Sequence, residues 1–335
     1  MRVARWALGL VMAIVLAASF GGVGRAANPV TAGTPGQVIV EPQAGATPYV
    51  RAIAAARHAV DVEAYIITDR EIVQALKDVA ARAVTVRVIV AGNPYDDSSA
   101  VKQERAEFAG SRVQVRLAPA QFERPYVYDH AKFLVIDPGT SSGVGILGSS
   151  NLDYSGLGGG NREYDWRTTQ GATVSALATV FQADWGGRPT PVEASRVLVL
   201  SPGSETAIVS LISSAKHSVD IETEEFGDVP AVMSALEADL HRHVTVRIVV
   251  PTSLSRWDMR QVDTLVGDGG RAIGLRSPYP HSKLIVVDGH VAFLGSENFS
   301  TSSFLENREV GIEVQGPQVT LLERQFNLDF GSQGG

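Results

Sequence analysis

The chain contains His281-Ser-Lys-Leu-Ile-Val-Val-Asp288 and, six residues later, Gly295-Ser-Glu-Asn298. An earlier stretch has the same order, His130-Ala-Lys-Phe-Leu-Val-Ile-Asp137 followed by Gly148-Ser-Ser-Asn151. The first copy has four more residues between its Asp and its Gly, which we expect to enlarge a hairpin turn beside the site and to influence the substrate. A set of His, Lys and Asn that occurs twice is what two half-sites around one phosphate require.

The repetition extends beyond these motifs to most of the chain. Three further pairs of segments match in the same order in both halves: residues 56–63 with 215–222, residues 84–90 with 244–250, and residues 161–163 with 307–309. Ordered matches of this kind indicate an internal duplication. The sequence therefore predicts two homologous domains, at residues 33–188 and 195–331, joined where Gly and Pro gather at residues 186–191.

Within each half, segments with helical and strand patterns alternate. A helix is expected from Thr47 to His58, a strand at residues 60–66, and a buried strand at residues 84–90. Thr68 and Glu71 form a capping-box pattern, which predicts a helix start between these two strands. Because the second half repeats the pattern, the predicted fold class is α/β, with a helix-covered sheet built twice.

The composition is that of a folded protein with a large core. Of the 335 residues, 44% are hydrophobic and 19% are charged, which argues against disorder. The chain has no cysteine, so disulfides, thiolate metal sites and a cysteine nucleophile are excluded. We expect neither a metal ion nor an organic cofactor.

Residues 1–26 have the pattern of a signal peptide. Arg2 and Arg5 precede an apolar run from Trp6 to Phe20, and a candidate cleavage site follows at residues 24–26. The run is short for a bilayer span. We therefore expect an exported protein, secreted or periplasmic, whereas retention of the segment would anchor the protein to a membrane. Removal of the segment takes the formal charge from −7 to −10, which disfavours non-specific binding to nucleic acid.

Each half offers an imidazole, an ammonium and an amide. His130 and Lys132 stand two apart at the start of a predicted strand, so their side chains share one face, roughly 6.5–7 Å apart. His281 and Lys283 have the same spacing, and Asn151 and Asn298 follow the neighbouring predicted strands. Two such sets facing each other would stabilise the oxygens of a five-coordinate phosphorus without a metal.

The two histidines suggest a division of labour. One imidazole can attack phosphorus to form a phosphohistidine, while the other protonates the leaving alkoxide and then activates water. The two copies are symmetric in sequence and do not show which histidine attacks. Glu163 and Glu309 of the repeated Asn-Arg-Glu are candidates to bond a ring nitrogen and fix its tautomer, and the alternative is a solvated turn.

Two further repeated positions have competing interpretations. Ser149 and Ser296, each after a glycine that both copies share, are expected to combine close packing with a hydroxyl that binds the substrate near its phosphate, and the alternative is a purely structural role. Asp137 and Asp288 stand at the start of predicted hairpin turns, where Asp is favoured for local backbone bonding, so we expect a structural role for them. Asp288-Gly289 itself predicts a two-residue hairpin turn.

The full pattern resembles the signature of the phospholipase D superfamily. The spacing His-x-Lys-x4-Asp-x6-Gly-Ser-x-Asn is met from His281 to Asn298, and the first copy departs from it by its longer turn. The resemblance covers nearly the whole chain after the N-terminal segment. It implies two tandem α/β/α sandwich domains related by a pseudo-two-fold axis, with the active site at their interface.

The resemblance also implies a chemistry, that of a metal-independent phosphodiesterase with a phosphohistidine intermediate. By the usual pattern of the family, His130 would be the nucleophile and His281 the general acid and base. The remaining motif residues would bind phosphate oxygens or, in the case of the two glutamates, orient the histidines: Lys132, Lys283, Asn151, Asn298, Glu163 and Glu309.

Four hypotheses for the function follow, in decreasing order. The first is phospholipase D-type hydrolysis, or phosphatidyl transfer, on a phospholipid, which implies contact with a membrane surface. The second is an exported non-specific endonuclease, for which nucleic acid would be the partner. Transfer of the cardiolipin synthase kind ranks lower because such enzymes usually carry membrane segments, and a non-catalytic phosphate-binding module ranks last because neither half has lost its His, Lys or Asn. No obligate protein partner is inferred.

Overall fold

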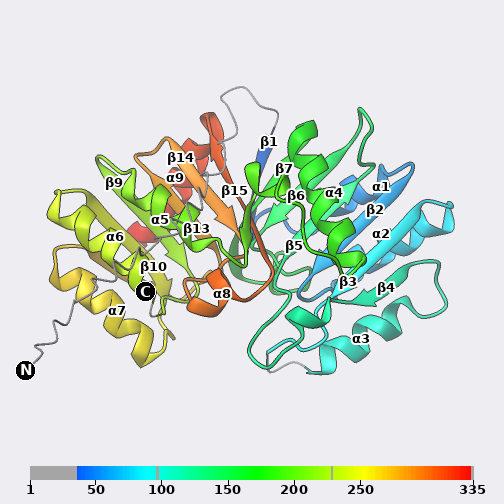
Figure 1. Ribbon diagram of the computed structural model, residues 1–335, viewed down its shortest axis with the longest axis horizontal. Coiled ribbons are helices and arrows are strands. Elements are labelled where there is room, and N and C mark those ends of the chain that lie inside the picture. The colour runs from blue at the N-terminus through cyan, green and yellow to red at the C-terminus, as the bar shows by residue number, and fades with distance from the viewer. Residues whose placement is uncertain (1–35, 96–97, 228, 333–335) are drawn as a thin grey trace, which may run out of the picture.

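The computed structural model describes residues 36–95, 98–227 and 229–332, so the expected signal peptide lies outside the described residues. Two sheets with flanking helices lie next to each other, and their strands carry the two halves of the chain (Figure 1). This arrangement confirms the predicted α/β fold class. Within the described ranges, no helix has the length and apolar character needed to cross a bilayer.

The first sheet is formed by the N-terminal half. Its strands are, in chain order, β1 (Gly36–Glu41), β2 (Ala59–Ala64), β3 (Thr85–Val90), β4 (Gln114–Leu117), β5 (Lys132–Ile136), β6 (Val144–Gly148) and β7 (Asn161–Thr168). Their spatial order is β1-β7-β6-β5-β2-β3-β4, in which β2, β3 and β4 are parallel and the other neighbours antiparallel. The helices of this half are α1 (Thr47–Ala54), α2 (Arg70–Ala81), α3 (Ser98–Phe108) and α4 (Gly171–Trp185).

The second sheet repeats this topology strand by strand. Its strands are β8 (Val199–Ser201), β9 (Ser218–Thr223), β10 (Thr245–Pro251), β11 (Arg271–Leu275), β13 (Lys283–Val287), β14 (Val291–Gly295) and β15 (Glu309–Gln315), in the spatial order β8-β15-β14-β13-β9-β10-β11. The remaining elements are α5 (Glu205–Ser213), α6 (Pro230–His241), α7 (Arg256–Gly267), β12 (Tyr279–Pro280), α8 (Thr301–Leu305) and α9 (Pro317–Gly331). The equal strand orders confirm the duplication, while the expected domain boundaries stay predictions.

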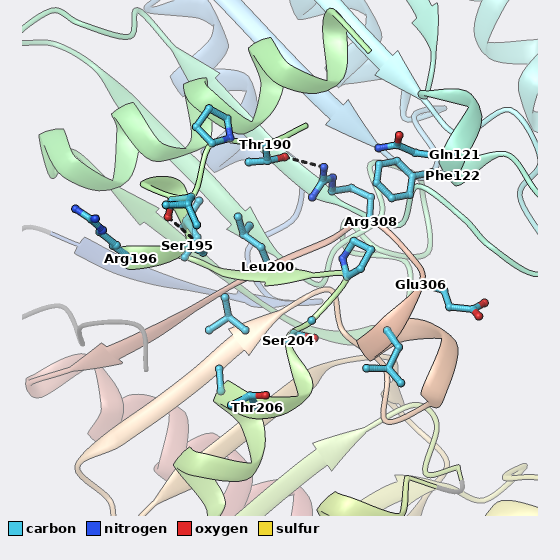
Figure 2. A pocket seen from close by; sticks show the side chains of 18 of the residues that line it. Gln121, Phe122, Thr190, Ser195, Arg196, Leu200, Ser204, Thr206, Glu306 and Arg308 are labelled. Atoms are coloured by element: carbon cyan, nitrogen blue, oxygen red, sulfur yellow. Dashed lines mark hydrogen bonds between the residues drawn. The ribbon is translucent and has the colours of Figure 1, made fainter. Parts of the chain in front are cut away.

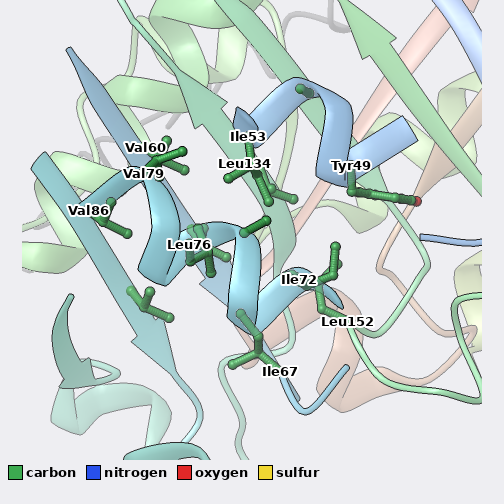
Figure 3. Close-up of a cluster of buried hydrophobic side chains, with 14 of the residues drawn as sticks. Tyr49, Ile53, Val60, Ile67, Ile72, Leu76, Val79, Val86, Leu134 and Leu152 are labelled. Carbon is green, nitrogen blue, oxygen red and sulfur yellow. The ribbon is translucent and has the colours of Figure 1, made fainter. Parts of the chain in front are cut away.

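The core explains how the two motif strands come to face each other. Side chains alternate along β5, so Leu134 packs under α1 and α2 with Val60 and Leu76 (Figure 3), while Phe133 points to the opposite face. On that opposite face Phe133 belongs to a cluster that also contains Leu284 of β13 and residues of α4 and α9. The two halves therefore share one hydrophobic core between their sheets, and β5 and β13 both contribute to it.

Three local expectations about helix and turn ends are wrong by a few residues. Helix α1 ends at Ala54, four residues before His58. The N-cap of α2 is Asp69 and not Thr68, because the Asp69 side chain accepts bonds from the backbone N–H groups of the first helical turn. The turn between β13 and β14 has three residues, since Val287 pairs directly with Val291.

The enlarged turn of the first copy lies at residues 137–143, as expected, but not beside the site. It joins the end of β5 to the start of β6, whereas His130 and Lys132 stand at the beginning of β5. One strand of five residues, about 16 Å long, separates the turn from the site. The expectation that this turn adjoins the histidine is therefore wrong, because the extra residues lengthen the far end of the hairpin.

Candidate active site

The segment before each motif histidine pairs with the last strand of the opposite half. β12 lies parallel to β7, and the backbone N–H of His281 donates to the Arg162 carbonyl at 3.2 Å. In the equivalent contact, the N–H of His130 donates to the Arg308 carbonyl at 2.9 Å. These crossed backbone bonds fix both histidines at the interface between the halves.

A carboxylate from the second half holds the imidazole of His130. Nδ1 lies 2.9 Å from Glu309 Oε2 and 3.1 Å from the carbonyl oxygen of Ser296. Glu309 is fixed in turn, because Ser303 Oγ donates to its Oε1 at 2.5 Å and Asn307 Nδ2 donates to the same oxygen at 3.1 Å. With Nδ1 engaged, His130 is left with Nε2 for chemistry.

His281 has the corresponding contact with a carboxylate of the first half. Its Nδ1 lies 2.6 Å from Glu163 Oε1, and Asn161 Nδ2 donates to that oxygen at 3.3 Å. Glu163 and Glu309 thus each meet a histidine, and they do so crosswise between the halves. Neither half alone contains a histidine together with its carboxylate.

Burial and charge move the pKa values of the first pair in a useful direction. Burial lowers the pKa of His130, and the charges of Lys132 and Lys283 lower it further against the pull of Glu309. Burial alone would raise the pKa of Glu309, but His130 and Lys132 hold it below its usual value. The pair therefore favours a neutral imidazole beside an ionised carboxylate near pH 7, which is the state in which an imidazole can act as a nucleophile.

The arginines of the two Asn-Arg-Glu motifs clamp the halves together. Arg162 Nε donates to Asp329 Oδ2 on α9 at 2.8 Å, and Arg308 Nη2 donates to Asp184 Oδ1 on α4 at 2.9 Å. All four side chains are buried, and both pairs join one half to the other. Sequence reasoning gave these arginines no role, although repetition of the whole tripeptide was the signal for one.

Lys132 is buried beside His130 under the ring of Tyr65. Its Nζ donates to the His130 carbonyl at 2.8 Å and lies 5.1 Å from the centre of the Tyr65 ring. Lys132 is 3% exposed, and its burial together with the charge of Lys283 lowers its pKa to about 7. The two lysines are therefore close enough for the charge of one to affect the other.

Lys283 has a partner that sequence reasoning missed. Its Nζ lies 3.1 Å from Glu224 Oε2 and also donates to the His281 carbonyl. The same Glu224 oxygen is 3.3 Å from His281 Nε2. Burial would raise the pKa of Glu224, but His281 and Lys283 lower it to about 2. Extending the alignment of residues 56–63 with 215–222 by two positions would have set Glu224 against Tyr65 and shown the difference.

The two motif asparagines follow β6 and β14 with their side-chain amides available to a ligand. The Oδ1 atoms of Asn151 and Asn298 are buried and have no hydrogen-bond partner in the described part of the chain. The Asn298 backbone N–H donates to Ser303 Oγ at 2.9 Å, which ties this loop to α8. An amide oxygen only accepts hydrogen bonds, so a bound phosphate would take its bonds from the Nδ2 groups, and the Oδ1 atoms would still need a donor from the substrate or water.

The motif serines fasten neighbouring strands to each other. Ser149 Oγ accepts the N–H of Tyr164, and Ser296 Oγ accepts the N–H of Val310, both at 3.0 Å. These bonds join the loop after β6 to β7 and the loop after β14 to β15. The close-packing interpretation is supported by these contacts, while contact of either hydroxyl with a substrate stays a prediction.

The motif aspartates have local backbone bonds of the kind expected. Both lie in the left-handed region, with φ of 47° at Asp137 and 52° at Asp288. The Asp137 carboxylate accepts the backbone N–H groups of residues 57–59, and Asp288 accepts those of residues 216–218. Despite some burial, these bonds lower the pKa of both carboxyls. Each aspartate thus anchors the start of β2 or β9, at the end of the hairpin away from the histidine.

A separate cavity of about 770 Å³ lies between the linker and the second half. Figure 2 shows Thr190 of the linker, Ser204 before α5, and Arg308 around it. Arg308 bonds to Thr190 Oγ1 at 2.8 Å, and its guanidinium lies 4.7 Å from the centre of the Phe122 ring. The lining residues include neither motif histidine, so this cavity is distinct from the cluster described above.

The cluster as a whole suits transfer of a phosphorus group through an imidazole. Two histidines with Nδ1 engaged by carboxylates meet two lysines at one interface, and the motif asparagines follow the neighbouring strands β6 and β14. Within the described ranges, no group of three or more His, Asp or Glu side chains has an arrangement suited to a metal ion. Lys132 and Lys283, each next to a motif histidine, are positive side chains that can face a bound phosphate.

The sequence matches the family described as "Cardiolipin synthase, PLD-like domain" over residues 49–185 and 208–330. The chain belongs to the phospholipase D superfamily. Each of the two matched segments contains one complete motif, with His130 in the first and His281 in the second. The resemblance that the motif spacing suggests is thereby confirmed for this superfamily member.

Curated relatives agree with this assignment. The chain is 27% identical to a cardiolipin synthase of Halalkalibacterium halodurans, covering 90% of this chain and 67% of the relative. It is 28% identical to a cardiolipin synthase of Geobacillus kaustophilus, covering 82% of this chain and 62% of the relative. The superfamily member thus spans about two thirds of the length of these relatives.

Solved structures share the fold at lower identity. A phosphatidylserine synthase of Haemophilus influenzae matches with a TM-score of 0.68 at 13% identity, covering 89% of this chain and 86% of that one. A polyphosphate kinase of Porphyromonas gingivalis matches with a TM-score of 0.64 at 18% identity, covering 87% of this chain and 49% of that one. These likenesses show that the fold is shared with both proteins.

Proposed function

We propose that this superfamily member transfers a phosphatidyl group from a phospholipid to an alcohol through a phosphohistidine. The observation that carries the proposal is the crossed pair of contacts, His130 with Glu309 and His281 with Glu163, beside two lysines. The sequence alone ranked phospholipid hydrolysis or phosphatidyl transfer first, and the cardiolipin synthase relatives support transfer above hydrolysis. Secretion, lipid degradation and nuclease activity stay predictions.

In the first step, Nε2 of His130 attacks phosphorus and the bond from phosphorus to the headgroup oxygen breaks. His281 gives its Nε2 proton to the departing oxygen, so the alcohol leaves neutral. Lys132, Lys283, Asn151 and Asn298 stabilise the phosphoryl oxygens in the transition state. Glu309 holds His130 in the tautomer that attacks and stabilises the charge that forms on its ring.

In the second step, an acceptor alcohol occupies the place of the departed headgroup. His281, now neutral, removes the proton of the alcohol, whose oxygen bonds to phosphorus while the bond to His130 breaks. Water in the same place would give hydrolysis instead. The ratio of transfer to hydrolysis therefore depends on whether an alcohol or a water molecule is bound beside His281.

The decisive experiment uses vesicles of dioleoylphosphatidylglycerol in the presence of EDTA. Mass spectrometry should detect cardiolipin and glycerol, and His130→Ala and His281→Ala should each lose this activity by several orders of magnitude.

Other outcomes contradict the proposal in distinct ways. Phosphatidic acid without cardiolipin would show hydrolysis and not transfer. Cleavage of single-stranded DNA with no lipid turnover would favour the endonuclease hypothesis. Loss of activity in EDTA, or substantial activity in both histidine variants, would contradict the phosphohistidine mechanism.

We also propose that residues 1–26 direct export. Their charged, apolar and small-residue regions follow one another in the order typical of a signal peptide. N-terminal sequencing of the protein recovered from the extracellular or periplasmic fraction should begin after residue 26. An intact N-terminus in the membrane fraction would show a retained anchor.

A further inference from the structure

The two half-sites differ at one position beside the lysines. Tyr65 and Glu224 each stand at the same place in the repeat, following β2 and β9. The Tyr65 ring lies edge-on to His130, with 4.7 Å between the ring centres. Glu224 instead puts a carboxylate 3.3 Å from His281 Nε2 and 3.1 Å from Lys283 Nζ. The His130 side of the site is therefore aromatic, and the His281 side is ionic.

Other hydrogen-bonding side chains surround Glu224. Burial together with the charges of Asp258 and Glu224 raises the pKa of the neighbouring Glu225 to about 7. Burial and the charge of Glu224 likewise raise the pKa of Tyr279, which precedes His281 by two residues. The Glu224 side chain is 26% exposed, so a ligand can reach its carboxylate. This corner of the site is lined for a polar group.

The proposed function decides which part of the substrate meets this corner. In an in-line displacement, the attacking nitrogen and the leaving oxygen lie on opposite sides of phosphorus. If His130 attacks, the headgroup oxygen leaves toward His281, whose Nε2 supplies its proton. Glu224 touches that same nitrogen. The carbon chain of the headgroup alcohol therefore begins next to Glu224.

We propose that Glu224 selects the headgroup alcohol by accepting a hydrogen bond from a second hydroxyl close to the reacting oxygen, as in glycerol. Lys283 already compensates the charge of Glu224, so a neutral hydroxyl fits this position better than a second cation. A simple alkyl alcohol has no second hydroxyl to donate to this carboxylate, which would be desolvated without a replacement bond. This inference rests on the proposed function and assigns the residue that reads the headgroup.

The test compares two donors that differ only in the headgroup hydroxyls. Dioleoylphosphatidylglycerol and dioleoylphosphatidylpropanol have the same acyl chains, the same phosphate charge and the same number of headgroup carbons. With excess ethanol as a common acceptor alcohol in both assays, release of the headgroup gives the kcat/KM ratio of the glycerol donor to the propanol donor for wild type, Glu224→Gln and Glu224→Ala. We expect Glu224→Ala to lower the ratio about tenfold, through the KM of the glycerol donor, as loss of one hydrogen bond to a charged group predicts. Glu224→Gln keeps an acceptor oxygen, so its donor ratio should lie between those of wild type and Glu224→Ala.

Tyr65→Phe is the matched control, because it changes the equivalent position of the other half. It should leave the donor ratio at the wild-type value whatever it does to the overall rate. A ratio that is equal in wild type and Glu224→Ala would overturn the selection role while leaving the proposed function intact. An equal loss on both donors would make Glu224 only a counter-ion of Lys283 and would also overturn it.

Two further outcomes are informative. If Glu224→Ala lowers kcat/KM more for dioleoylphosphatidylethanolamine than for the glycerol donor, Glu224 prefers an ammonium group. The hydroxyl assignment would then be wrong. If wild type cleaves neither diester, the proposed function itself fails, and the role of Glu224 in headgroup selection fails with it.

Discussion

Glu309 Oε2 lies 2.9 Å from Nδ1 of His130, although the two residues are 179 positions apart and belong to different halves of the chain. The distance is that of a charge-assisted hydrogen bond, which fixes both the tautomer and the orientation of a ring. Glu163 does the same for His281 at 2.6 Å. Each histidine therefore depends on the half that does not contain it.

Replacing the crossed carboxylate should slow the chemical step. In Glu309→Gln we expect kcat to fall roughly 10- to 100-fold with little change in KM, because the amide no longer stabilises the charge that develops on His130. Steady-state kinetics on phosphatidylglycerol vesicles would measure this, with Glu71→Gln on the exposed face of α2 as the control. An unchanged kcat in Glu309→Gln would show that the contact has no part in catalysis.

The pH profile should report the buried lysine. Because the pKa of Lys132 is lowered to about 7, this side chain carries its charge below that pH and loses it above, so kcat/KM should decline as the pH rises past about 7. Lys132→Arg keeps its charge at every accessible pH and should move the decline upward. Lys77→Arg on α2, where the Lys77 side chain is 29% exposed, serves as the control. A decline at the same pH in Lys132→Arg would assign it to another group.

The motif aspartates should matter for stability and not for turnover. Asp137→Ala removes the acceptor of three backbone N–H groups, and we expect a loss of about 2–4 kcal/mol in the free energy of unfolding with a near-normal kcat of the folded protein. Denaturant titration would measure it, with the exposed Asp78→Ala as the control.

The acid dependence of that stabilisation has a defined sign. Because the pKa of Asp137 is lowered on folding, the stabilisation is complete above the unfolded pKa of about 3.9 and declines as the pH falls through the folded value. Asp137→Ala should accordingly lose less stability than wild type over that acid range. A kcat reduced by several orders of magnitude in the folded variant would instead give Asp137 a part in the chemistry.

The arginine clamps should behave as coupled buried pairs. Arg162→Met leaves the Asp329 carboxylate buried without its partner, and we expect a loss of about 3–5 kcal/mol in stability. Adding Asp329→Asn should restore part of the loss, which a double-mutant cycle of denaturant unfolding would reveal. The exposed Arg70→Met provides the baseline. Strictly additive effects of the two substitutions would show that the pair is not coupled.

Much of the fold could be predicted from the sequence repeat, but the contact of each histidine with the glutamate of the other half could not. Matching segments in the same order predicted two α/β units, and equal strand orders confirmed this. The sequence could not show that Glu309 meets His130, because Glu163 stands in the same relation to its own motif and either pairing satisfies the spacing. Only the pairing of β12 with β7, a contact between segments more than 100 residues apart, decides between the two.

Other errors arose where a neighbouring residue competed for the same role. Asp69 replaced Thr68 as the cap of α2 because a carboxylate one position later reached the free N–H groups. Glu224 was not predicted because repetition indicates only the residues that agree between the two halves. Its difference from Tyr65 carries the information, since it makes two otherwise equivalent half-sites chemically unlike.

Both halves of the site lie in one chain, and this affects how the enzyme works at low concentration. Two separate copies of one half would have to meet before either histidine acquired its carboxylate, and dilution would undo the encounter. Joined by the linker at residues 186–191, the halves assemble the site as an intramolecular event that is independent of enzyme concentration. Because both halves lie in one chain, each half can acquire substitutions that the other lacks. One side of the site can then hold the phosphatidyl group while the other side binds the alcohol that is exchanged.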